Sequence, residues 1–151
     1  MRIHIATDHA GLAFKNTLAN HLSQQGHDPV DHGAYEYDPN DDYPAFIISA
    51  AEAVAKEQGE GIETLGVVFG GSGNGEQIAA NKVRGVRAAL VWNESTAKLA
   101  RQHNDANIIS IGARQHDESE VLRLIDAFIA EPFSGDERHI RRIQQIADYE
   151  Q

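Results

Sequence analysis

Short β-rich runs alternate with longer helical stretches along nearly all of this 151-residue chain, and this alternation constrains the fold more than any other feature. One run, Leu65-Gly66-Val67-Val68-Phe69, is apolar without a break, which is typical of a central parallel strand covered on both faces. Strands that alternate with helices form βαβ units with right-handed crossovers. We therefore predict a three-layer α/β/α fold of Rossmann-like type, with a mainly parallel five-stranded sheet. The five predicted strands are 2–7, 28–32, 65–69, 87–92 and 108–111.

The segments between these runs carry helix signals. Phe14, Leu18 and Leu22 recur every four positions, on one face of a helix that Gly26 ends. The other helices are expected from Pro44 to just before Gly59, from Glu76 to about Lys82, from Asn93 to Gln102, and from a cap at Asp117 and Glu120 to Pro132. An extra C-terminal helix is predicted to open with the capping box Ser134-Gly135-Asp136-Glu137. Without a repeat or linker, residues 1–151 are expected to form a single domain.

Composition excludes several classes of protein. The formal net charge of −10 disfavours a nucleic-acid partner, because phosphate backbones require a cationic surface. No apolar run approaches the ~20 residues of a membrane span, and the first residues do not resemble a secretory signal. The chain has no cysteine, so disulfides and thiolate-ligated zinc are ruled out. We expect a cytoplasmic protein with no nucleic-acid and no membrane partner.

A glycine-rich stretch, 70–75, follows the apolar run and precedes a predicted helix. It does not match the dinucleotide fingerprint, because its third glycine comes one position early and after the wrong strand. It is not a P-loop, since Glu76 and Gln77 stand where Lys and Ser or Thr belong. A loop of this kind still presents backbone N–H groups that can stabilise a phosphate or a developing oxyanion. A tight structural turn is the alternative, but so many glycines together favour close approach of the backbone to a ligand.

Polar residues gather at the predicted strand ends, where open α/β sheets bind their ligands. Asp8 and His9 follow the first strand, and Glu76 lies in the first turn after the glycine stretch. Taken alone, Glu76 is better explained as a carboxylate favoured by the helix dipole, and a single histidine is more often a capping or hydrogen-bonding residue than a catalyst. The eight histidines show no H-E-x-x-H spacing, so we predict no metal site.

Arg138 and Arg142 lie four positions apart and therefore share one face of the last helix. Two guanidinium groups on one face suit the oxygens of a single phosphate. Ion pairing on the helix surface is the competing interpretation.

Taken in order, the motifs of this chain resemble the ribose-5-phosphate isomerase B family, which also contains galactose-6-phosphate isomerase subunits. The matching segments span almost the whole chain: 8–11 (Asp-His-Ala-Gly), 42–44 (Asp-Tyr-Pro), 70–75, 78–82 (Ile-Ala-Ala-Asn-Lys), 103–104 (His-Asn), Arg114 and 138–142. Each segment is weak by itself, whereas the ordered set is specific.

The resemblance implies a homodimer with shared active sites, no metal or other cofactor, and a small sugar phosphate as substrate. It assigns phosphate binding to His9, Arg114, Arg138 and Arg142, and opening of the sugar ring to His103 with Asp8. Ser72 would move a proton between the two substrate oxygens, and the loop N–H groups would stabilise the enediolate. The remaining substrate contacts implied are Asp42, Tyr43, Gly71, Gly73, Asn74, Gly75, Asn104 and His139.

One departure from the family pattern concerns the base. Many members place a cysteine directly before the glycine loop, where this chain has Gly70. A second branch carries a glutamate after G-S-G-N-G, as Glu76 does here, so we assign the base to Glu76. Its pKa should rise from about 4.3 on partial burial.

The expected reaction is the interconversion of D-ribose 5-phosphate and D-ribulose 5-phosphate through a cis-enediolate. The sequence leaves open a six-carbon or four-carbon sugar phosphate as substrate. It also leaves open a phosphosugar-binding module without catalysis.

Overall fold

The computed structural model describes residues 1–150 of the chain; Gln151, the last residue of the expected domain, lies outside them. Its centre is a five-stranded sheet in the order β2-β1-β3-β5-β4, in which every pairing is parallel. The strands are β1 (Arg2–Thr7), β2 (Asp28–Asp31), β3 (Thr64–Gly70), β4 (Ala88–Leu90) and β5 (Ile108–Gly112). The α/β fold and the number of strands are therefore confirmed.

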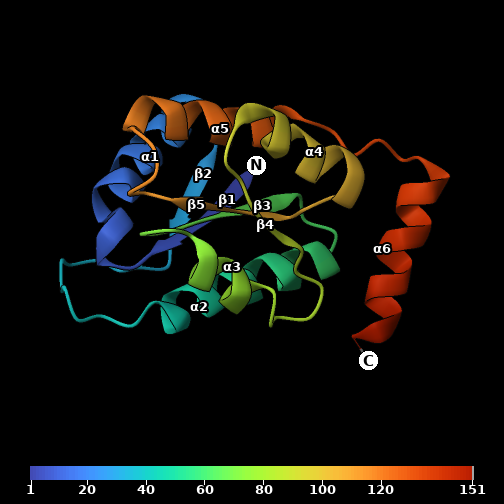
Figure 1. The fold of residues 1–151 in the computed structure, drawn as a ribbon, viewed down its shortest axis with the longest axis horizontal. Coiled ribbons are helices and arrows are strands. Elements are labelled where there is room, and N and C mark those ends of the chain that lie inside the picture. Colours follow the sequence, from blue (N-terminus) through green and yellow to red (C-terminus); the bar gives the residue numbers. More distant parts are fainter. Residues whose placement is uncertain (151) are drawn as a thin grey trace.

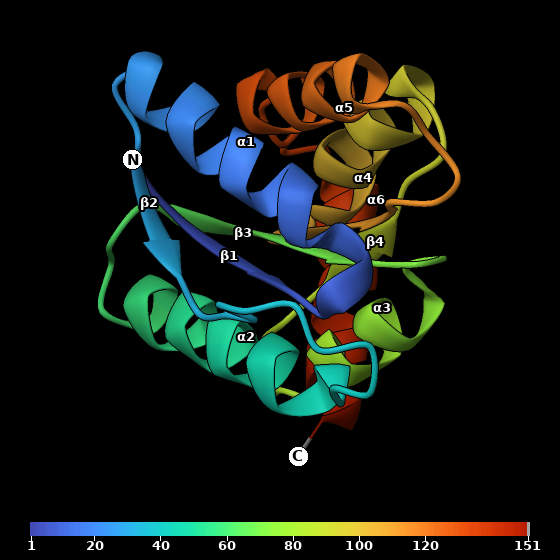
Figure 2. The same ribbon diagram turned by 90° about the vertical axis from the view of Figure 1, so that its left-hand side faces the viewer.

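Helices cover both faces of the sheet. On one face lie α1 (Leu12–Gln24), α4 (Glu94–Asn104) and α5 (Glu118–Ala130), and on the other lie α2 (Tyr43–Gly59) and α3 (Asn74–Ala80) (Figures 1 and 2). Each face has its own apolar core, the first built around Phe69 and Phe128 and the second around Val68 and Ile47. Neighbouring residues of β3 thus point into opposite cores, which explains why this strand is apolar without a break.

The last helix, α6 (Glu137–Tyr149), stands apart from the layers beyond the end of α4 (Figure 1). His139 is its only buried residue, and its isoleucines Ile140 and Ile146 are about half exposed. None of the described helices combines the length and the apolar character that a membrane-spanning helix requires.

Two local predictions were wrong. The fourth strand is shorter than 87–92, because the N–H of Arg87 donates to the Asn107 side chain and the N–H of Trp92 donates to Thr96. Helix α6 is capped at Asp136 rather than Ser134, since the Ser134 hydroxyl is engaged with the His139 ring at 2.8 Å.

The predicted caps of two other helices are confirmed. The Asn93 side chain accepts a hydrogen bond from Thr96 N, and the Asp117 side chain accepts one from Glu120 N. Both are short polar side chains at the first turn of a helix, where backbone N–H groups have no partner within the helix.

Candidate active site

The sheet order has a switch point between β1 and β3. After β1 the chain turns to one side to form β2, and it then returns to form β3 on the other side of β1. The crossover segments therefore diverge at the carboxyl ends of these two strands, the place where open α/β sheets generally bind their ligands. Asp8 and His9 directly follow β1, and the glycine loop directly follows β3.

The glycine loop is fixed by its backbone against the end of β5. The N–H of Ala113 donates to Gly70 O at 2.7 Å, and the N–H of Arg114 donates to Gly71 O at 3.1 Å. Gly73 has φ +79°, a left-handed conformation that L side chains rarely adopt, and it caps α3. This glycine lets the helix begin at Asn74, two residues earlier than predicted, and Ser72 Oγ accepts from the N–H of Asn74 at 3.3 Å.

Glu76 lies in the first turn of α3 with only 4% of its surface exposed. Its carboxyl group fills the space that a side chain at residue 70 would need, because a Cβ built on Gly70 would overlap both carboxyl oxygens. Burial raises the pKa of the Glu76 carboxyl; a backbone hydrogen bond opposes this rise, and the charge of Asp8 adds to it. The direction agrees with the shift expected from the sequence for a general base.

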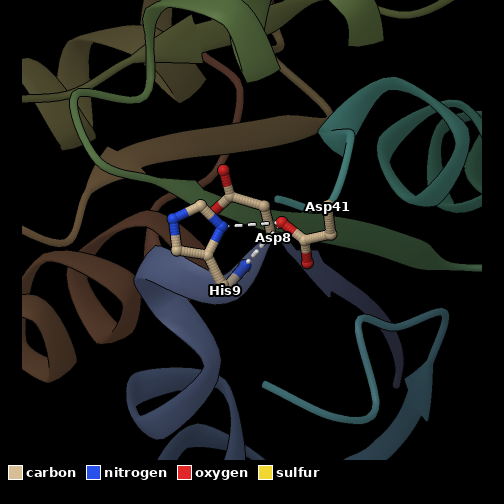
Figure 3. Close-up of side chains that lie close together, drawn as sticks. All are labelled: Asp8, His9 and Asp41. Carbon is tan, nitrogen blue, oxygen red and sulfur yellow. Dashed lines mark hydrogen bonds and ion pairs between the residues drawn. The ribbon is translucent and has the colours of Figure 1, made fainter. Parts of the chain in front are cut away.

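Asp8 and His9 meet Asp41, which reaches them from the loop before α2 (Figure 3). Asp8 is buried, and its Oδ1 accepts a hydrogen bond from Ala10 N at 2.9 Å. Asp41 Oδ1 accepts hydrogen bonds from His9 Nδ1 at 2.7 Å and from His9 N at 3.2 Å. The three residues offer ligand-type atoms within 4.8 Å of one another, so the absence of a metal stays a prediction.

Two further predicted residues border the glycine loop. Arg114 follows β5 and places its Nη1 3.1 Å from the position of a Cβ on Gly71. The Tyr43 hydroxyl lies where a Cβ on Gly75 would stand, so this position has no room for a side chain. Asp42 precedes Tyr43 as the exposed N-cap of α2, with no hydrogen bond from its side chain to the helix.

The other predicted site residues form a second group. His103 and Asn104 end α4, and the Asn104 carbonyl accepts a hydrogen bond from Arg87 Nε just before β4. The rings of His103 and His139 lie 4.4 Å apart, and burial together with the charge of His103 lowers the pKa of His139. Arg138 and Arg142, on the same helix as His139, are exposed.

The first group lies at the carboxyl ends of the strands (the carboxyl edge of the sheet), and the second lies at their amino ends (the amino edge). The end of α4 leads into the amino end of β5, whereas the glycine loop follows the carboxyl end of β3. The seven residues of β3 span about 20 Å at ~3.3 Å per residue. One chain therefore does not bring His103 and the α6 arginines to Glu76.

Comparison with known proteins identifies the family. A family model described as Ribose/Galactose Isomerase matches residues 3–146. The chain belongs to the ribose/galactose isomerase family.

Members of this family with high similarity cover nearly the whole chain. Ribose-5-phosphate isomerase B of Mycobacterium tuberculosis is 52% identical over 150 residues, which are 99% of this chain and 90% of the relative. The Escherichia coli K12 protein of the same name is 33% identical and covers 99% of this chain and 97% of its own. A solved structure of ribose-5-phosphate isomerase B from Mycoplasma genitalium, with bound ribulose-5-phosphate, is 43% identical with a TM-score of 0.93 and covers 99% of this chain and 95% of that one.

Sequence reasoning missed one residue of the carboxyl-edge group, Asp41. Asp41 belongs to the acidic, turn-rich segment 35–42, in which the family resemblance implies a substrate contact only for the neighbouring Asp42. The side chain of Asp41 is only 9% exposed, which is unusual for an aspartate in such a loop. The only signal in the sequence was its position at the end of a turn that leads into a helix.

Proposed function

We propose that this chain interconverts D-ribose 5-phosphate and D-ribulose 5-phosphate, with Glu76 as the general base. The observation that carries the proposal is the Glu76 carboxyl group, buried at the switch point beside the glycine loop with a raised pKa. A base with a raised pKa is better matched to work near neutral pH than an ordinary carboxylate. The similarity to ribose-5-phosphate isomerase B proteins supports the choice of reaction.

The chemical step moves one proton between neighbouring carbons. The Glu76 carboxylate takes the proton from C2 of the open-chain aldose, and the electron pair becomes the C1–C2 double bond of a cis-enediolate. The same carboxyl group then returns a proton to C1, and a proton moves between the oxygens on C1 and C2, which gives the ketose. Ser72 is suited to this second transfer because its hydroxyl belongs to the glycine loop, which lies against the Glu76 carboxyl group at Gly70.

The glycine loop would stabilise the negative charge that develops on the enediolate. Its donors are the backbone N–H groups of residues 71–73 and 75, at the N-terminus of α3, where the helix dipole also favours an anion. Glycine at residues 71 and 75 makes room for the side chains of Arg114 and Tyr43, and it leaves the loop N–H groups without a side chain of their own to shield them.

We propose further that two copies of the chain share each site. His9 and Arg114 lie at the carboxyl edge of the sheet, whereas Arg138, Arg142 and His103 lie at the opposite edge. A two-fold dimer that places the amino edge of one copy beside the carboxyl edge of the other would bring both groups to one substrate. The exposed isoleucines of the projecting helix α6 are suited to this contact.

A complementation experiment tests the shared site. Assayed at ribose 5-phosphate concentrations well below KM, the Glu76→Gln and Arg142→Ala homodimers should each show only a small fraction of wild-type activity. If the site is shared, a refolded equal mixture contains heterodimers with one intact site, and it should recover about a quarter of wild-type activity. If Glu76 and Arg142 act within one chain, no mixture recovers activity.

The activity itself is tested by following conversion of ribose 5-phosphate to ribulose 5-phosphate by the purified protein. The matched family model is named for both ribose and galactose, so a six-carbon phosphate is the second substrate to compare. We expect kcat/KM to favour the five-carbon sugar. If the protein binds aldose phosphates but converts none of them, the isomerase function is wrong and the chain is a phosphosugar-binding module without catalysis.

A further inference from the structure

The contact between His9 and Asp41 has no role in the reaction as described so far. His9 is the first residue after Asp8 at the end of β1, and Asp41 lies 32 positions further along the chain. The side chain of Asp41 is 9% exposed, and its other oxygen, Oδ2, has no hydrogen-bond partner within residues 1–150. Burying a carboxylate with so few partners destabilises the fold, so we expect its contact with His9 to serve the function of the site.

We infer that Asp41 is a positioning residue that fixes the ring of His9 for phosphate binding; the inference rests on the proposed function. One carboxylate oxygen accepts both from the backbone N–H of His9 and from its ring, which sets the ring orientation relative to the backbone. Because a carboxylate only accepts, the shared ring proton is on Nδ1. A phosphate oxygen accepts hydrogen bonds, so with phosphate bound the opposite nitrogen, Nε2, also carries a hydrogen: the ring then donates from Nδ1 to Asp41 and from Nε2 to the phosphate.

The geometry around His9 agrees with this role. Nε2 lies on the side of the ring away from Asp41 (Figure 3), and 19% of the side chain remains exposed. The edge of the Tyr37 ring stands against His9 with centroids 5.9 Å apart and an interplanar angle of 90°. Tyr37 and Asp41 belong to the same loop, so this loop holds the ring from two sides and leaves Nε2 free for a phosphate oxygen.

Histidine tautomers can be observed directly, and this gives a test that does not depend on activity. In long-range ¹H–¹⁵N spectra of the labelled protein, His9 is identified by the signals that disappear in His9→Gln. We expect the neutral ring to be protonated at Nδ1 in the wild type and to shift toward protonation at Nε2 in Asp41→Ala. An unchanged tautomer in Asp41→Ala would overturn the inference, whether or not the chain is an isomerase.

Binding and turnover provide the second readout. Asp41→Ala should raise KM for ribose 5-phosphate and weaken binding of inorganic phosphate about tenfold, with kcat within about threefold of wild type. Asp41→Asn keeps an acceptor oxygen in place without the charge, so it should lie between wild type and Asp41→Ala. Glu36→Ala removes an exposed carboxylate from the same loop and serves as the matched control, with KM unchanged.

The outcomes separate the two proposals. A wild-type protein that binds phosphate without isomerising the sugar overturns the proposed function and leaves the tautomer and phosphate tests of Asp41 valid. Conversely, if the wild type is active and Asp41→Ala has the same KM and phosphate affinity as Glu36→Ala, only the role of Asp41 is overturned.

Discussion

Gly70 controls whether the Glu76 carboxylate can occupy its position, and Gly70→Ala is the most informative single substitution. A Cβ at residue 70 would overlap the carboxyl carbon and both oxygens of Glu76. Contact between nonbonded carbon atoms normally requires about 3.5–4.0 Å, so the carboxylate must move by more than about 1 Å. The methyl group is attached to the backbone of a buried strand and cannot yield, whereas the glutamate side chain can rotate.

A displacement of that size predicts a large loss of turnover. Misplacing a catalytic group by about 1 Å costs on the order of 10²-fold, or about 2.7 kcal/mol in the barrier. We therefore expect kcat for ribose 5-phosphate to fall at least 100-fold in Gly70→Ala. Binding should persist, because the proposed phosphate ligands are not touched.

The assay is steady-state conversion of ribose 5-phosphate, accompanied by thermal unfolding of each variant. Gly59→Ala is the matched control, because a Cβ there meets no atom within 4 Å. It should keep full activity. If folded Gly70→Ala retains more than about a tenth of wild-type kcat, the position of the Glu76 carboxylate is not what catalysis requires.

The further predictions concern three charged side chains, Glu76, Arg142 and Glu57. Glu76→Gln should lower kcat by roughly two to four orders of magnitude with little change in KM. The same substitution should raise the Tm at pH 7, because the pKa of Glu76 is raised in the folded state and the charged carboxylate therefore destabilises the fold above the ordinary pKa near 4.5. The increase in Tm should vanish below that pH, and a lower Tm at pH 7 would contradict the prediction. Arg142→Ala should raise KM about tenfold or more and spare kcat, and an unchanged KM removes it from the phosphate site. Glu57 is buried against His4 and Arg2. Burial by itself would raise the pKa of Glu57, but the hydrogen bonds from His4 and Arg2 outweigh burial and lower this pKa to about 2. The contact therefore stabilises the fold above about pH 4.5, and this stabilisation is lost as the pH falls toward 2. Glu57→Gln should lower the free energy of unfolding at pH 7 by roughly 1.5–3 kcal/mol and reduce the fall of Tm between about pH 4.5 and pH 2. A plot of Tm against pH that coincides with that of the wild type argues against the contact.

The sequence was sufficient to predict the fold because its signals are local. Apolar runs such as 65–69 specify buried strands, and caps such as Asn93 and Asp117 specify helix starts within a few residues. The rule for open sheets directed attention to the carboxyl ends of the strands, and Asp8 and the glycine loop do follow β1 and β3 there. The false cap at Ser134 shows the limit of such signals, because the competing partner of its hydroxyl is the ring of His139.

The site was less predictable because it depends on contacts between distant residues. The burial of Asp41 depends on the path of an irregular loop, for which no periodicity exists. The separation of His103 from Glu76 follows from topology, since a helix that joins two parallel strands ends at the amino edge of the sheet. A list of matching motifs carries no such information, and only the fold shows that the motifs form two groups.

The central claim is that the Glu76 carboxylate removes a proton from C2, and isotope exchange tests it most directly. Ribose 5-phosphate is incubated with the protein in D₂O, and deuterium at C2 of the recovered sugar is measured by ¹H NMR. The account predicts deuterium incorporation with the wild type and a loss in Glu76→Gln that parallels the loss of isomerisation. Exchange in Glu76→Gln at the wild-type rate would contradict it.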